Sequence, residues 1–354
     1  MSEPLPRPPR PLPIGGFLGM ELPAAIGAAS LRARWKLPGP QSAFATARSA
    51  FKGLLDALPS GAVFLPAYLC PEMSAVVPLA RRRFYPIDES LSPQVSFLAA
   101  RVAPGDIVLG VDYFGRPPGA DFLAYVAQHP QVHFVEDCAQ ALATGCEAWG
   151  DWQLYSPRKL VGVPDGGVLV ARSGRAAATP LADSVPGDCA AAVDLARAQW
   201  MRHEDADEEQ NDRWYPLHRA KEDAMGVSAT RISRLAWELL DRLDLDAIAA
   251  ARRRNYAVLA GLLADVALLD ALPAGCVPLG FPVRVAAVRR DTIRGRLFDA
   301  RIYPAVHWEH LLAPAHEFAA EHALAAGALT LPCDQRYAAE QMQRLATAFR
   351  AASA

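Results

Sequence analysis

Short apolar runs alternate with helical segments over residues 40–171, and this alternation limits the fold more than any other feature. Runs such as Ala62–Tyr68, Asp106–Tyr113 and Val132–Asp137 are bounded by turn residues. Segments of about a dozen residues with helical spacing separate them. Strands and helices in this order indicate an α/β fold with a mostly parallel central sheet and helices on both faces.

The segments before and after this alternation differ from it in composition, so the chain is expected to have three parts. Residues 1–15 contain six prolines, so residues 1–39 are expected to form an extended, mobile arm and a lead-in. Residues 40–245 would form the large α/β domain. Within it, the charged stretch 203–213 is expected to be a solvated helix face or loop. A long helical tract from Ser228 to about Ala264 would lead into a small C-terminal α+β domain, residues 246–354.

Composition excludes several classes of protein. The chain has 354 residues and a formal net charge of −2, so nothing favours nucleic acid as a partner. No run approaches the roughly 20 apolar residues that span a membrane, and the N-terminus has no apolar signal segment. The six cysteines show neither C-x-x-C pairs nor zinc spacing, so no metal is expected. A cytoplasmic protein without membrane contact is the expectation.

Lysine is scarce, and its scarcity directs attention to a few positions. The 36 basic residues comprise 32 arginines and four lysines: Lys36, Lys52, Lys159 and Lys221. Lysine differs from arginine because it can lose its proton and act as a nucleophilic amine. Lys159 follows the expected strand Trp152–Ser156 and precedes the glycine pair Gly166–Gly167, so it is the lysine with the most suggestive surroundings.

A second polar group follows the apolar strand His133–Asp137. Asp137 is either the N-cap of a following helix or a buried carboxylate that faces a cation. An acid at one strand end and a lysine after the next strand together suit pyridoxal phosphate. The amine forms a Schiff base with the cofactor aldehyde, and the carboxylate keeps the ring nitrogen protonated. The segment Thr46–Ser49 could supply a helix N-terminus and hydroxyls for the phosphate.

Four segments resemble the DegT/DnrJ/EryC1/StrS family of sugar aminotransferases, which are fold-type-I enzymes. They are VEDCAQA (135–141), GDWQLYSPRKLVGVPDGGVL (150–169), the helical segment 230–259 and IYPAVHW (302–308). The chain resembles a divergent, shorter branch of that family. The resemblance implies that Lys159 is the Schiff-base lysine. The cofactor contacts that it implies are Asp137 to the ring nitrogen, Gln140 to the 3-hydroxyl, Ser156, Ala47, Arg48 and Ser49 to the phosphate, and Tyr68 and Tyr113 beside the ring.

The chain also departs from the family pattern. Arg48 stands at the position of the family's phosphate-loop threonine. At about Ala229, the family has an asparagine that reaches the phosphate bound by the neighbouring subunit. Matching Ser156 requires a deletion of two residues before Lys159. His307 matches a strand end over the substrate mouth, and is read either as a substrate contact or as a structural residue. Arg231 matches a recurrent family arginine that either contacts substrate or packs in the dimer.

The resemblance implies a pyridoxal-phosphate-dependent aminotransferase that works as a homodimer. The amino-group donor would be an amino acid, with glutamate as the first choice. The acceptor would be a nucleotide-linked keto-sugar in polysaccharide or secondary-metabolite synthesis. Two alternatives stay open. One is a lyase or dehydratase on the same fold, although the family's dehydratases replace the lysine with histidine. The other is a non-catalytic homologue that binds a sugar nucleotide or a partner protein.

Overall fold

The computed structural model describes residues 11–23, 31–35, 43–187, 190–205 and 209–354. Most of the predicted proline-rich arm therefore lies outside the described residues, as does Lys36. Among the described helices, none is long and apolar enough to cross a membrane.

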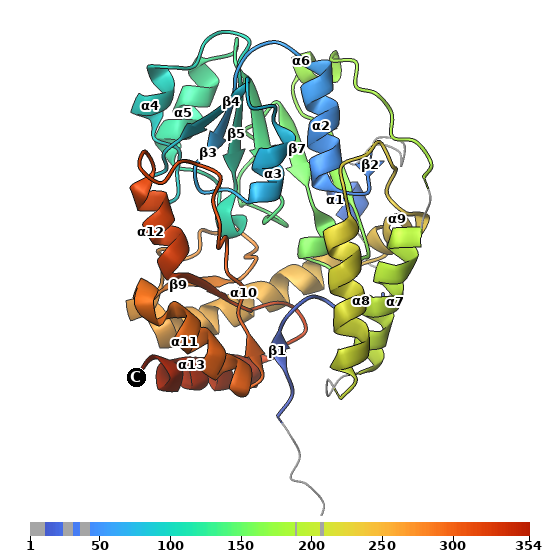
Figure 1. Cartoon of the computed structure of the whole chain (residues 1–354), viewed down its shortest axis with the longest axis vertical. Coiled ribbons are helices and arrows are strands. Elements are labelled where there is room, and N and C mark those ends of the chain that lie inside the picture. The colour runs from blue at the N-terminus through green and yellow to red at the C-terminus, as the bar shows by residue number, and fades with distance from the viewer. Residues whose placement is uncertain (1–10, 24–30, 36–42, 188–189, 206–208) are drawn as a thin grey trace, which may run out of the picture.

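A seven-stranded sheet forms the centre of the molecule (Figure 1). Its strands in spatial order are β2 (Ala43–Phe44), β8 (Gly167–Ala171), β7 (Trp152–Tyr155), β6 (His133–Asp137), β5 (Ile107–Val111), β3 (Val63–Pro66) and β4 (Arg82–Tyr85). The five strands from β7 to β4 are mutually parallel, whereas β8 runs antiparallel to both of its neighbours. The predicted α/β fold with a mostly parallel sheet is confirmed.

Helices cover the sheet and bury two apolar clusters against it. The helices of this part are α1 (Leu31–Arg34), α2 (Ala47–Ala57), α3 (Pro71–Val76), α4 (Val95–Ala99), α5 (Ala120–Gln128), α6 (Gly174–Ala177) and α9 (Arg234–Leu240). One cluster joins side chains of α2 and α5, such as Phe51 and Phe122, to Trp152 of β7. The other joins Val168 of β8 to Trp237 of α9.

The helix expected over residues 42–57 begins later than predicted. Residues 43–44 form the edge strand β2 instead, paired antiparallel with the start of β8. Thr46 then ends the extended backbone, with φ −139° and ψ 153°, and its side chain accepts the N–H of Ser49. A threonine in this conformation satisfies a donor that helix geometry leaves open, so α2 starts at Ala47.

The long tract expected from Ser228 to about Ala264 is two helices. α9 ends at Leu240, and α10 (Leu245–Leu263) begins after Asp244, whose carboxylate accepts the N–H of Ala247 at 3.0 Å. Leu235, in the first turn of α9, is exposed, whereas Trp237 and Leu240 of the same helix are buried.

The C-terminal part has its own small sheet and apolar cluster. β9 (Phe281–Arg284) pairs antiparallel with β11 (Ala328–Leu331). α13 (Ala339–Ser353) packs against α10 and against α11 (Ala287–Asp299), and α11 also packs against α12 (Ala319–Gly327). A further pair, β10 (Ile302–Tyr303) with β1 (Ile14–Gly15), is parallel and draws the N-terminal segment into this part (Figure 1). We propose that residues 246–354 form the small domain, completed by β1.

A helical hairpin lies between the two parts of the chain. α7 (Ala190–Glu204) and α8 (Asn211–Ala224) pack side by side below α9 and α2 (Figure 1). The described residues of the charged stretch 203–213 lie at the hairpin's turn and are mostly exposed, as expected. The helix α8 itself was not predicted.

Replacing Gly167 with alanine is expected to destabilise the fold by about 1–3 kcal/mol, the usual cost of overpacking. A Cβ at this position would lie 1.9 Å from the Thr46 carbonyl carbon and 2.1 Å from the Ala47 nitrogen. These are backbone atoms at the start of α2, so they cannot move aside without displacing the helix. The measurement is urea unfolding of G167A. The control is G174A, because a Cβ there meets nothing within 4 Å; equal stability of the two variants would contradict the prediction.

Candidate active site

Several strand ends meet at one edge of the sheet and border a cavity of about 960 Å³. Asp137 ends β6, Ser156 follows β7 and Thr46 precedes α2 beside the start of β8. This edge is where α/β sheets bind ligands. The structure brings the following predicted site residues together in the cavity lining: Ala47, Arg48, Asp137, Gln140, Ser156, Lys159 and His307.

Lys159 ends a single 3-10 turn, Pro157–Lys159, and points its side chain into the cavity. Its backbone N–H donates to the Ser156 carbonyl at 3.1 Å. Among the three lysines that the structure describes, Lys52 pairs with Asp56 and Lys221 with Asp194. The Lys159 amine alone of these three has no hydrogen-bond or ion-pair partner within the described chain.

Asp137 is a buried carboxylate and not a helix cap. The residues that follow it form turns, and its Oδ1 accepts the N–H of Ala139 at 2.9 Å. Burial raises the pKa of Asp137, and the nearby Lys159 opposes that rise. The sequence allowed two interpretations of Asp137. The helix N-cap is wrong, because no helix follows, and the structure has instead a buried carboxylate near the Lys159 cation.

Gln140 presents an amide nitrogen with no partner. Its Oε1 accepts the N–H of Phe114 at 2.8 Å, which fixes the orientation of the amide. Its Nε2 is buried and makes no hydrogen bond within the described residues, although the side chain lines the cavity. A buried unsatisfied donor is costly and calls for an acceptor. This donor fits the ring oxygen that the resemblance assigns to it.

The other end of the cavity is bordered by the start of α2. Thr46, Ala47 and Arg48 line it, and the first N–H groups of a helix have no acceptor within the helix. Arg48 reaches across to donate from Nη2 to the Met225 carbonyl at 2.7 Å. Helix N–H groups, a guanidinium and the adjacent Ser156 together make a site suited to a phosphate.

Two predicted residues lie near the cavity without lining it. The Ser49 hydroxyl is 2.9 Å from the Thr46 hydroxyl and accepts the N–H of Ser228 at 3.2 Å, which directs it away from the cavity. Arg231 donates to the Ser184 carbonyl at 2.9 Å. Their proposed contacts to phosphate and substrate are thus not part of the cavity wall within this chain.

The two predicted tyrosines are fully buried behind the cavity wall. The Tyr113 hydroxyl donates to the Tyr68 carbonyl, and the ring centroids lie 5.6 Å apart. Both rings pack against Trp308, at 5.3 Å from Tyr68 and 6.4 Å from Tyr113, and Trp308 does line the cavity. The tyrosines therefore support an aromatic wall whose exposed member is a tryptophan that sequence reasoning did not single out.

His307 lies at the cavity with a neutral ring. Its Nδ1 is 2.8 Å from the Thr330 hydroxyl, and Phe114 packs edge-on at 5.8 Å between ring centroids. Burial, with a smaller contribution from the Lys159 charge, lowers the pKa of His307 to about 3. The ring can thus offer a hydrogen bond without adding charge.

We expect His307 to remain neutral at pH 5 in the folded protein. Since an unfolded histidine has a pKa of about 6.5, folding favours the neutral ring. That stabilisation is complete above about pH 6.5 and is lost as the pH falls toward 3. Histidine NMR titration of the wild type and H307Q measures the pKa, with the exposed His316 in the same spectra. A His307 pKa near 6.5 would contradict the expectation.

α8 and the N-terminal segment close one side of the cavity, and sequence reasoning missed both. Arg158, beside Lys159, donates to Glu222 of α8 at 2.6 Å. His218 Nε2 lies 3.3 Å from Glu222, and its ring stacks on Phe17 at 3.5 Å between centroids. The hydrogen bond with His218 and the Arg158 charge lower the pKa of Glu222. The only signal in the sequence was the run of charges before α8.

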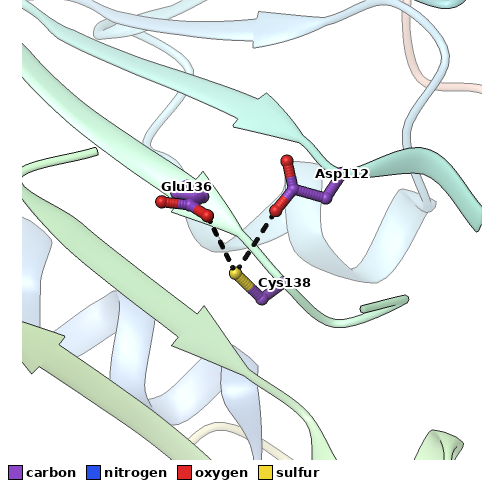
Figure 2. Close-up of side chains that lie close together, drawn as sticks. All are labelled: Asp112, Glu136 and Cys138. Carbon is purple, nitrogen blue, oxygen red and sulfur yellow. Dashed lines mark hydrogen bonds between the residues drawn. The ribbon is translucent and has the colours of Figure 1, made fainter. Parts of the chain in front are cut away.

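Behind Asp137, Asp112, Glu136 and Cys138 form a buried cluster (Figure 2). The Cys138 Sγ lies 3.4 Å from Asp112 and 3.5 Å from Glu136. Burial and the Glu136 charge raise the pKa of Asp112. The carboxylates also accept N–H groups, two on Glu136 Oε2 and the Trp149 indole on Asp112 Oδ1. These hydrogen bonds tie the ends of β5 and β6 to the loop before β7.

Solved structures share this fold, whereas the sequence matches no protein-family model and no curated protein. A DegT DnrJ EryC1 StrS aminotransferase from Brucella abortus is 19% identical, covers 91% of this chain and 88% of its own, and has a TM-score of 0.63. NtdA from Bacillus subtilis with bound cofactor PMP is 14% identical, over 88% of this chain and 72% of its own, with a TM-score of 0.60. DesI in the presence of its TDP-sugar product is 18% identical, covers 96% of this chain and 95% of its own, and has a TM-score of 0.60. The chain therefore shares its fold with these structures, one of which carries the name of the family that the sequence resembles.

Proposed function

We propose that this protein is a pyridoxal-phosphate-dependent aminotransferase acting on sugars. The observation that carries the proposal is the unpartnered Lys159 amine in one cavity with the buried carboxylate of Asp137 and the free Nε2 of Gln140. A reactive amine, a carboxylate and a donor at strand ends are the three groups that the pyridine ring of this cofactor requires. The shared fold with NtdA, which binds PMP, supports the same conclusion.

The residues of the cavity would hold the cofactor at two ends. Asp137 would pair with the ring nitrogen and Gln140 with the ring oxygen. At the other end, the N–H groups at the start of α2, the Arg48 guanidinium and the Ser156 hydroxyl would bind the phosphate. An arginine binds phosphate more strongly than the threonine of the family, because its charge assists the hydrogen bonds.

The chain's own groups account for the proton movements. When bound, the cofactor supplies an electron sink for the α-carbon of an amino-acid donor. Lys159 Nζ would take the α-proton and return it on the cofactor side, which is general acid–base work. The Asp137 carboxylate would favour the protonated ring nitrogen. The aromatic wall with Trp308 would limit the access of water.

The finer assignments follow from the family resemblance. We propose glutamate as the donor and a nucleotide-linked keto-sugar as the acceptor, supported by the fold shared with DesI, which was solved with its TDP-sugar product. We also propose that the protein is a cytoplasmic homodimer, as the family resemblance implies.

Absorbance spectroscopy tests the proposal directly. Pyridoxal phosphate added to the purified protein should give the yellow band of the lysine-bound cofactor, and glutamate should bleach it with formation of 2-oxoglutarate. A protein that never gives the band is not this enzyme but a non-catalytic homologue. A band with release of ammonia or loss of water from the substrate, and without 2-oxoglutarate, identifies a lyase or dehydratase.

A further inference from the structure

Three polar side chains hold the turn behind the reactive lysine, and we propose that Arg252, Gln335 and Glu21 are positioning residues for Lys159. They come from the middle of α10, the loop after β11 and the N-terminal segment, which are far apart in the sequence. The inference rests on the proposed function, because it explains how the amine that this function needs is kept in place. We call these three residues the clamp.

Arg252 makes the central contact of the clamp. Its side chain is fully buried, and Nη2 donates to the carbonyl of Leu160, the residue after Lys159, at 2.7 Å. Nη1 donates to both carbonyls of residues 278–279 at 3.0 Å, and Nε donates to Gln335 at 2.8 Å. A buried charge is tolerated only when its donors are satisfied. The guanidinium therefore ties the lysine's turn to two other segments.

Gln335 and Glu21 complete the clamp. The Gln335 Nε2 donates to the same Leu160 carbonyl at 3.0 Å and to Glu21 Oε2 at 2.9 Å. Glu21 accepts the N–H of Gly162 at 3.0 Å through Oε2 and donates its own N–H to the Gly162 carbonyl at 3.0 Å. A Cβ on Gly162 would lie 2.0 Å from the Gly19 carbonyl oxygen, so only glycine allows the N-terminal segment to approach this closely.

The electrostatics of the clamp also favour a fixed arrangement. The positive charge of Arg252 faces the carboxylates of Glu21 and Asp334, which oppose the lowering of the Arg252 pKa by burial. Burial raises the pKa of Glu21, and the Gly162 N–H and the Arg252 charge both lower it. Each charge in the clamp is thus matched by a neighbour from a different part of the chain.

The turn that carries Lys159 has little support of its own. It is a 3-10 turn of three residues, and such turns are weak on their own. The Lys159 amine has no partner within the described residues, so its position depends on the backbone of the turn. Displacing a reacting group by about 1 Å costs on the order of 10²-fold in rate. Hydrogen bonds on Leu160 and Gly162, just after Lys159, are a direct means of preventing such a displacement.

Four variants test the clamp: E21A, E21Q, R252K and the control R253A. E21A removes the acceptor for Gly162, whereas E21Q keeps one oxygen for it. R252K keeps the charge but cannot make all four hydrogen bonds. Arg253 is exposed on the same helix and makes no hydrogen bond with the turn among the described residues. Two readouts are used: amide hydrogen exchange of residues 158–163 without cofactor, and the rate at which the yellow band forms after pyridoxal phosphate is added.

We expect E21A and R252K to accelerate exchange in the turn by about tenfold, the effect of one lost hydrogen bond, and to slow band formation. E21Q and R253A should resemble the wild type. If E21A and R252K exchange and react like R253A, the clamp does not exist. If R252K fails to fold, E21A decides the question. If no variant, including the wild type, gives the band but E21A still loosens the turn, the proposed function fails while the clamp is upheld.

Discussion

Replacing Lys159 with alanine is expected to lower kcat for amino transfer by at least about 10³-fold, since a positioned proton-transfer group alone is worth about 10²–10⁴-fold. The loss has two sources. The variant lacks the amine that would bond to the cofactor, and neither of the other two described lysines can take over the proton transfer. Lys52 and Lys221 are paired with acids and do not line the cavity. Steady-state kinetics with glutamate and an acceptor keto-sugar measures the effect.

Lys52 provides the matched control for this experiment. K52A removes a lysine whose ion pair with Asp56 is exposed, and exposed pairs contribute little. Its activity should equal that of the wild type. Adding a small primary amine should restore part of the K159A activity, because the free amine can occupy the space that the side chain leaves. A K159A variant with more than about a tenth of the wild-type kcat would remove Lys159 from the mechanism.

The central sheet was predictable because its signals are local. An apolar run of four or five residues followed by a helical segment is a pattern within one stretch of chain. β8 was predicted at the residues where it forms, Gly167–Ala171, because a glycine pair marks its start. The break between α9 and α10 has a local signal as well. Ser233 and Asp244 are capping residues, each accepting the N–H three positions later, and a search for caps would have found them.

Contacts between distant segments could not be read from the sequence. β1 and β10 are two residues long and pair across nearly the whole chain, so neither has a periodic pattern to detect. Arg252 is one arginine among 32, and nothing near it distinguishes it from its exposed neighbours. Its burial results from the fold, because the carbonyls that it binds come from residues 160 and 278–279.

The residues of the candidate site also fall into those that the sequence could predict and those that it could not. Asp137 and Lys159 follow strands, and the carboxyl ends of strands meet at one edge of the sheet, so their proximity could be predicted from order alone. The role of Gln140 came from the resemblance, and its free Nε2 agrees with that role. Ser49 was expected at the phosphate because it lies in the segment Thr46–Ser49, whereas the roles of the two tyrosines came from the resemblance. The side chains of the tyrosines turn into the core because an aromatic ring at a strand end has apolar neighbours on both sides.

The second large effect is expected from replacing Asp137 with asparagine. The side chain keeps its shape but loses the negative charge beside the proposed ring nitrogen. Removing one preorganised electrostatic group from an active site costs roughly 10²–10³-fold in kcat, and we expect a loss of this size. The absorbance maximum of the bound cofactor should shift, because the ring nitrogen loses its proton. A variant with wild-type kcat and an unchanged spectrum would show that Asp137 does not contact the ring.

D137N should have the opposite effect on the free protein, and this contrast separates function from folding. Burial raises the pKa of Asp137 above its unfolded value of about 3.9. As the pH rises from the pKa of the unfolded Asp137 toward the higher pKa of the folded one, the carboxyl group loses its proton first in the unfolded chain. The free energy of unfolding of the wild type therefore falls over this interval. D137N lacks this fall and should be at least as stable as the wild type at neutral pH. D112N is the matched control, since burial also favours the neutral form of Asp112, but its side chain lies outside the cavity lining. It should therefore keep its activity, whereas a loss equal to that of D137N would mean that any change at this edge of the sheet disables the site.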